Sequence, residues 1–241
     1  MRGGGHEFIA YLDDDDEWLP EKLEKQLAKF NECGDDVAAV SCSWIAVNEE
    51  THKSVLIDSG QMAGSRSIFR TSLSMGPVSV PLLRTKCVVS VGGFNKDINT
   101  REDWELWLRL MKRYNQAFIH DALFVYHDHS GDRLTKSFAR MIQAHEYILS
   151  EYFSVIEEDM SAYRDMLIST ASIYAEAGKI GRSTATYFKF VNVKPFMIIS
   201  NIRAFLRVIS GYMKFSLKTI SPKLFGRLRN IKHKLKGRKD N

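Results

Sequence analysis

Residues 8–23 read FIAYLDDDDEWLPEKL, and this stretch decides the fold. It begins with five apolar, β-prone residues and stops abruptly at four consecutive aspartates, which is the pattern of a buried strand that ends in a loop. Pro20 follows as a first helical residue, and Leu23, Leu27 and Phe30 recur at spacings of four and three. The sequence therefore predicts a strand, an acidic loop and a helix with one apolar face.

The alternation of strands and helices continues to about residue 135. Strands are expected over 37–47, 52–57, 79–83, 88–91, 117–120 and 123–126, a helix over 102–113, and a loop over the Gly/Ser-rich residues 60–76. Mixed strands and helices predict an α/β layer structure. From residue 137 the pattern is helical almost throughout. We therefore divide the chain into an α/β domain over 1–135 and a helical extension over 136–241.

Composition and charge support a folded protein with two distinct regions. The 241 residues are 44% hydrophobic and 26% charged, which is enough apolar material for a sizeable core. The net charge of +5 hides an asymmetry, because 1–178 hold 18 Lys and Arg against 28 Asp and Glu, whereas 179–241 hold 16 against 1. Three scattered cysteines exclude a disulfide framework, and no leader or membrane-spanning stretch is readable, so we expect a cytoplasmic protein.

A basic stripe marks the segment from Phe196 to Ile220. Its polar residues are Ser200, Arg203, Arg207, Ser210, Lys214 and Lys218, at spacings of three and four on an otherwise apolar helix. Together with the cationic tail to residue 239, this predicts contact with an anionic membrane surface through 196–239. A helix packed on protein with its cations in water explains the pattern equally well. No nucleic acid partner is expected, because Phe225 is the one aromatic residue in 223–239.

The aspartate run is the first candidate for chemistry. Crowded carboxylates raise one another's pKa unless a cation or solvent screens them. Asp13 and Asp15 suit Mg²⁺ or Mn²⁺, which take one or two carboxylates and complete their shells with water and phosphate. The alternative is that these acids face water and favour the N-terminus of the following helix.

A second acidic pair, Glu102 and Asp103, begins the helix expected over 102–113. One of the two carboxylates is a candidate general base, although an ordinary acidic first turn with Trp104 in the core gives the same pattern. The pair His127 and His129 could ligate a metal or be plain surface imidazoles.

Four segments resemble the family 2 glycosyltransferases of the GT-A fold. They are residues 8–23 quoted above, GGFN at 92–95, REDWELWLR at 101–109 and YHDH at 126–129. The resemblance covers about residues 6–135 and implies a GT-A-like mixed sheet with flanking helices. It also implies that a sugar is transferred, with inversion, from a nucleotide-diphosphate-sugar donor to an acceptor hydroxyl. The implied acceptor is a glycan or lipid-linked glycan of the cell envelope, and the implied cofactor is Mg²⁺ or Mn²⁺.

The resemblance also implies roles for individual residues. Those of the donor site are Asp13 near the ribose, Asp15 on a metal that bridges the diphosphate, Asp16 in support, and His129 near the diphosphate or metal, with His127 the less favoured histidine. Those of the acceptor side are Asp103 as catalytic base, Glu102 beside it, and Trp104 lining the acceptor. These roles require Asp15 and Asp103 to share one bound donor.

One departure from the family pattern concerns the start of the chain. The resemblance implies strand-helix units ahead of the aspartate strand, yet Phe8 follows Met1 by seven residues. We therefore expect that the leading nucleotide-binding strands are missing, that the sheet has a long unpaired edge, and that the chain is truncated or has a partner supplying that half. The alternative function is that of a non-catalytic remnant that binds a membrane surface. For both functions the expected location is the cytoplasm, with peripheral attachment to the inner face of the cell membrane. A metal hydrolase built on His127, Asp128 and His129 ranks last.

Overall fold

The structure is a computed structural model that describes residues 5–58, 60–63, 65–128, 137–193 and 195–221. The chain forms two compact units, residues 1–132 and 133–241, and each is described by itself. The predicted boundary at 135/136 lies within 129–136, outside the described residues, and stays a prediction.

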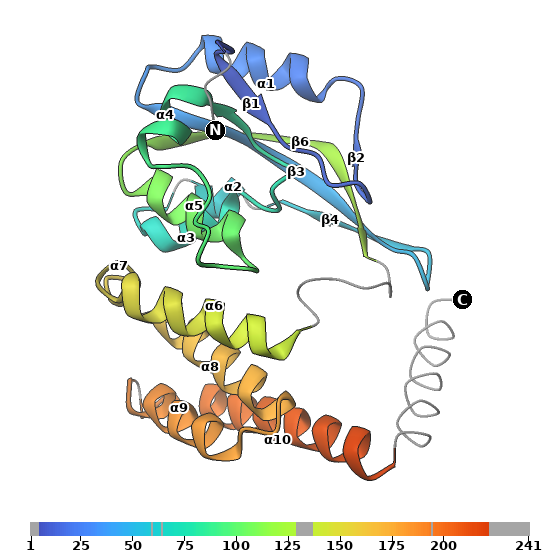
Figure 1. Cartoon of the computed structure of the whole chain (residues 1–241), viewed down its shortest axis with the longest axis vertical. Helices are drawn as coiled ribbons and strands as arrows, with labels where there is room; N and C mark the ends of the chain where they lie inside the picture. The colour runs from blue at the N-terminus through green and yellow to red at the C-terminus, as the bar shows by residue number, and fades with distance from the viewer. Residues whose placement is uncertain (1–4, 59, 64, 129–136, 194, 222–241) are drawn as a thin grey trace. The chain divides into compact units, whose positions relative to one another are not determined.

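The first unit is built on one mixed, six-stranded sheet (Figure 1). Its strands are β1 (Phe8–Ala10), β2 (Glu17–Trp18), β3 (Val37–Asn48), β4 (Lys53–Ile57), β5 (Leu82–Arg84) and β6 (Asn115–Asp128). The order is β1-β5-β3-β6-β2, with β4 paired to β3. Strands β3 and β6 are parallel and the other pairs are antiparallel. The α/β, GT-A-like mixed sheet with flanking helices is confirmed.

Helices cover both faces of this sheet (Figure 1). They are α1 (Lys22–Asn31), α2 (Gly60–Ala63), α3 (Ile68–Ser74), α4 (Thr85–Ser90) and α5 (Glu102–Met111). Side chains alternate along a strand, so Val40 shares a buried cluster with Phe30 of α1, whereas Ala39 shares one with Trp107 of α5. The apolar face predicted from Leu23, Leu27 and Phe30 is only partly buried, since Phe30 is enclosed and the two leucines are exposed.

Two sequence-based assignments are wrong. The loop predicted over 60–76 contains α2 and α3, and the Oγ of Ser67 caps α3 by accepting a hydrogen bond from the Arg70 N–H at 3.3 Å. The strand predicted over 88–91 belongs to α4 and the turn after it, which ends at Gly92 and Gly93 with positive φ. A short apolar run has no periodicity that separates a buried helix from a strand.

The strand β1 lies at one end of the sheet. Among the described residues it pairs with β5 alone, with Phe8 opposite Arg84 and Ala10 opposite Leu82. The unpaired edge that the sequence predicted to be long is therefore only three residues long.

The second unit is helical, as predicted. Its helices are α6 (Phe138–Glu151), α7 (Phe153–Glu157), α8 (Met160–Glu176), α9 (Ile180–Val193) and α10 (Ile198–Ile220). Helices α8, α9 and α10 share one apolar core that includes Ala171, Phe190, Ala204 and Val208. Across the described residues, none of the helices combines the length and apolar character needed to cross a membrane.

Candidate active site

The acidic loop follows the carboxyl end of β1. A turn closes it, because the backbone N–H of Asp16 donates to the carbonyl oxygen of Asp13 at 3.3 Å. The turn gathers side chains that an extended chain would keep apart. One carboxylate oxygen from each of Asp13, Asp15 and Asp16 lies within 4.8 Å of the other two. The sequence predicted these three acids as a group, and the loop brings them together.

Ser79, a fully buried residue just before β5, anchors the acidic loop. Its Oγ accepts a hydrogen bond from the Asp13 N–H at 3.0 Å and donates to Asp16 Oδ2 at 3.1 Å. Its carbonyl oxygen accepts from Trp18 Nε1 at 2.9 Å. Sequence reasoning missed Ser79, because no pattern links a single serine to a loop 66 residues earlier.

Two acids of the loop, Asp13 and Asp16, have raised pKa values. Burial raises the pKa of Asp16 from its ordinary value of 3.8 to about 6, against the lowering effect of the hydrogen bonds from Ser79 and His127. Burial and then the charges of Asp15, Asp14 and Glu102 raise the pKa of Asp13. Hard carboxylate oxygens at this separation fit Mg²⁺ or Mn²⁺, and a bound cation reverses the repulsion among them.

The N-terminus of α5 supplies a further carboxylate. Burial raises the pKa of Asp103 from 3.8 to about 6, although its Oδ1 accepts a hydrogen bond from the Trp104 N–H at 2.7 Å. Glu102 and Asp13 contribute to this rise in the pKa of Asp103 through their negative charges. The acids of α5 and those of the β1 loop therefore lie close enough to interact electrostatically. The roles expected from the sequence require the two groups of acids to lie near each other, because both must contact one bound donor.

Arg101, at the N-cap of α5, was not predicted to matter. Its backbone is left-handed, with φ of 58°, a conformation that costs a non-glycine residue of order 1–3 kcal/mol. Its guanidinium carbon lies 5.6 Å from the centre of the Trp104 ring, and its Nε is buried without a hydrogen-bond partner in the described part of the chain. The arginine thus places its positive charge where it interacts with Asp103.

The remaining predicted residues lie in different surroundings. Trp104 is buried, with its Nε1 donating to Ser72 Oγ at 3.1 Å, and its acceptor role stays a prediction. His127 reaches the acidic loop through its backbone N–H, which donates to Asp16 Oδ1 at 3.4 Å, while its ring Nδ1 lies 2.6 Å from Glu49 Oε1. His129 lies outside the described residues.

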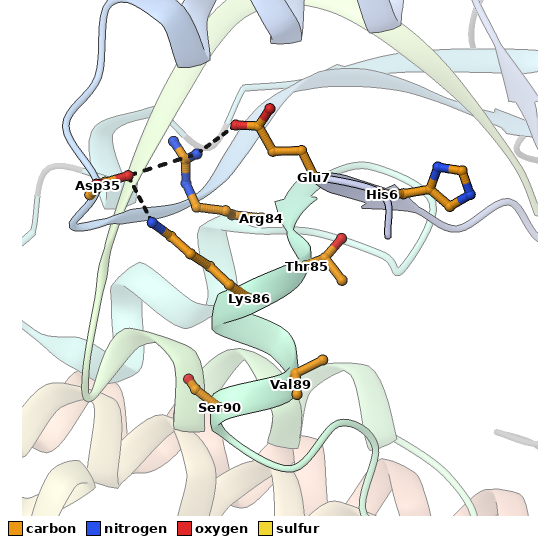
Figure 2. Close-up of a pocket in the computed structure, with 8 residues that line it drawn as sticks. All are labelled: His6, Glu7, Asp35, Arg84, Thr85, Lys86, Val89 and Ser90. Atoms are coloured by element: carbon orange, nitrogen blue, oxygen red, sulfur yellow. Dashed lines mark hydrogen bonds and ion pairs between the residues drawn. The ribbon is translucent and has the colours of Figure 1, made fainter. Parts of the chain in front are cut away.

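An open cavity of about 590 Å³ lies at the other end of β1 from the acidic loop (Figure 2). Its charged groups are paired with one another: Arg84 contacts Glu7 at 3.1 Å, and Lys86 contacts Asp35 at 2.8 Å. None of the acids of the β1 loop or of α5 lines this cavity. The candidate active site therefore consists of the acids of the β1 loop and of α5, and this cavity is separate from it.

The mixed sheet with flanking helices and the carboxylates clustered after β1 match a GT-A-like fold, and comparison with known proteins gives the family. The chain belongs to the glycosyltransferase-like family 2, whose family model matches residues 4–166. It is 18% identical over 218 residues to an uncharacterised glycosyltransferase of Rickettsia typhi. That alignment covers 89% of this chain and 65% of the relative, so the chain spans about two thirds of the relative's length.

Proposed function

We propose that this chain transfers a sugar from a nucleotide-diphosphate-sugar donor to a hydroxyl group of a glycan or lipid-linked glycan, with inversion at the anomeric carbon. The observation that supports the proposal is the convergence of Asp13, Asp15 and Asp16 after β1, where one carboxylate oxygen of each lies within 4.8 Å of the other two. The negative charge of Asp13 also contributes to the raised pKa of Asp103, 90 positions later in the sequence, which supports a donor and an acceptor that meet near both residues.

Asp103 acts as the general base in this proposal. Its carboxylate takes the proton from the acceptor hydroxyl as that oxygen attacks the anomeric carbon, and the bond to the nucleoside diphosphate breaks. A pKa of about 6 suits this role, because the group is ionised at neutral pH yet is more basic than an ordinary aspartate. Glu102, beside it, raises the pKa of Asp103 by charge.

The acidic loop holds the donor side. Asp13, Asp15 and Asp16 would hold a divalent metal ion, and Mg²⁺ or Mn²⁺ supplies positive charge to the leaving diphosphate when bound. Ser79 keeps Asp13 and Asp16 in place through its two hydrogen bonds.

The test is the Asp103→Asn variant of the whole chain, assayed with uridine and guanosine diphosphate sugars and Mn²⁺. We expect turnover to fall by about 10² to 10⁴, the usual contribution of a general base, while donor affinity measured by isothermal titration stays within about threefold of the parent. The matched control is Asp121→Asn, since Asp121 is an exposed carboxylate on β6 that pairs with Lys25. Asp121→Asn should leave turnover unchanged.

Two results would contradict the proposal. Sugar transfer by Asp103→Asn at nearly the parent rate would remove Asp103 as the base. Absence of any donor binding by the parent, with Mn²⁺ present, would instead support the non-catalytic binding module.

A further inference from the structure

Helix α10 carries an apolar stripe of seven residues, five of which are exposed. We define the apolar stripe by its members, Ile199, Ile202, Leu206, Ile209, Met213, Leu217 and Ile220, which recur at spacings of three and four. Ile199 is 68% exposed, Leu206 59% and Met213 60%, whereas Ile209 and Leu217 are partly buried. Large apolar side chains scattered singly on a surface are ordinary, but a continuous row of them marks an interaction surface.

A different face of α10 is the one that packs on its own unit. Asn201, Ala204, Val208 and Gly211 are buried against α8 and α9. The buried guanidinium of Arg164 fixes the rotation of the helix, because it donates to Asn201 Oδ1 at 3.0 Å and to the carbonyl oxygen of Phe190 at 2.9 Å. The apolar stripe therefore lies outside the face of α10 that forms the core of the second unit.

A basic stripe runs beside the apolar one. Arg203, Arg207, Lys214 and Lys218 each follow a member of the apolar stripe by one residue. Arg203 and Arg207 are exposed, Lys214 pairs with Glu176 at 2.6 Å, and Lys218 lies over the Phe138 ring. This order of an apolar row and a cationic row on one exposed side is the pattern of a helix that lies in a membrane interface.

We propose that the apolar and basic stripes of α10 dock this chain on an anionic lipid surface. The apolar row enters the boundary between head groups and acyl chains, and the adjacent arginines contact the lipid phosphates. We expect α10 to lie in the membrane interface and not to span the bilayer, because the four cations of the basic stripe are costly to bury in hydrocarbon. The inference is independent of the proposed transferase activity.

The composition of this region argues against two other partners for the apolar stripe, a second copy of this chain and a nucleic acid. Spacings of three and four also suit a coiled-coil seam with a second copy, but such a seam needs opposite charges beside it, and residues 179–241 hold 16 Lys and Arg against a single acid, Asp240. Nucleic acid contacts favour aromatic side chains that stack on bases, whereas six of the seven members of the apolar stripe are aliphatic and the seventh is Met213.

The experiment is flotation of the whole chain with vesicles of 70% phosphatidylcholine and 30% phosphatidylglycerol. At low salt, replacing both Arg203 and Arg207 by Gln should weaken binding about 25-fold, at about fivefold per cation near the surface. The matched control is Lys96→Gln with Lys112→Gln, which removes two exposed cations of the first unit and should change binding less than threefold.

Salt separates the apolar stripe from plain electrostatic attraction, including that of the basic tail. At about 0.5 M salt long-range attraction is screened, so residual binding depends on apolar insertion. Leu206→Ser with Met213→Ser should abolish that residual binding, whereas Leu56→Ser, at a site 61% exposed on β4, should not. Parent protein that stays in the soluble fraction at low salt, or a Ser double variant that floats like the parent at high salt, overturns the proposal. Self-association through α10 without flotation also overturns it.

Discussion

The burial of Asp103 has opposite consequences for stability and for chemistry. A carboxyl group with a raised pKa is a better base, but its ionised form is less stable in the folded protein than in water. The folded pKa of about 6 lies above the ordinary 3.8, so the folded state binds the proton more tightly. Stability therefore falls as pH rises from about 4 to about 6, by up to about 3 kcal/mol at ~1.4 kcal/mol per pKa unit.

The pH dependence of the parent and of Asp103→Asn tests this residue. We expect kcat/KM of the parent to fall on the acid side with a midpoint near pH 6, because the base is then protonated. Urea denaturation should show Asp103→Asn to be more stable than the parent above pH 6 and equal to it near pH 4, since the neutral amide carries no buried charge. A stability difference that is the same at pH 4 and pH 7 would exclude the buried charge as its cause.

Ser79 is the residue whose role the structure alone reveals. We expect Ser79→Ala to weaken Mn²⁺ binding by about 10- to 100-fold, the usual cost of losing a partner that orients a metal ligand. Binding of Mn²⁺ alone can be measured by titration calorimetry, without donor or acceptor.

Ser41→Ala is the control for Ser79→Ala. Ser41 is also fully buried, and its Oγ donates to the carbonyl oxygen of Met75 at 3.0 Å, away from the acidic loop. Both variants should lose about 1 kcal/mol of stability, but only Ser79→Ala should lose metal affinity. Equal Mn²⁺ affinities in the two variants would show that Ser79 is a packing residue.

At the scale of elements, close approach between helices places α10 on α8. A Cβ added at Gly211 would lie 2.9 Å from the Cβ of Ala175 and 3.3 Å from the carbonyl oxygen of Ser172. Since the contacted atoms are a Cβ and a backbone carbonyl oxygen of α8, no rotamer change can relieve the contact. The glycine thus lets α10 turn its small residues inward and its large apolar residues outward.

Two glycine substitutions test this packing. Gly211→Ala should destabilise the second unit by roughly 1–3 kcal/mol, because α10 must move away from α8. Gly181→Ala in α9 meets no atom within 4 Å and should stabilise by up to about 1 kcal/mol, through the higher helix propensity of alanine. Thermal unfolding followed by circular dichroism measures both, and a stabilised Gly211→Ala variant would mean that α10 is not held this closely.

At the scale of the whole molecule, the net charge changes sign along the chain, and the change falls within the second unit. Residues 1–178 hold 18 Lys and Arg against 28 Asp and Glu, whereas the last 63 residues hold 16 against 1. Any ligand that binds only the folded state raises the stability of the unit that holds it. A divalent metal should therefore stabilise the first unit, and the basic region should respond to lipid instead.

Metal-linked stability provides the matching prediction. Mn²⁺ at about 100 times its dissociation constant should stabilise the parent by about 2.7 kcal/mol, and a chelator should reverse this effect. Asp15→Asn should abolish the stabilisation, whereas Asp14→Asn removes the same charge from a carboxylate outside the converging group and should retain most of it. Differential scanning calorimetry with and without Mn²⁺ compares them. Equal loss in both variants would point to general charge relief and not to a metal site.

The sequence by itself determined the order of the main strands, the helix at Glu102, the helical second half and the acidic motifs. These follow from local periodicity and from residues adjacent in the chain. The tertiary structure alone decided that Ser79 holds the acidic loop, that Asp13 and Asp103 interact, and which face of α10 is buried. This is because burial, pKa and hydrogen bonding depend on atoms from distant parts of the chain, such as Asp16 and His127, which are 111 positions apart.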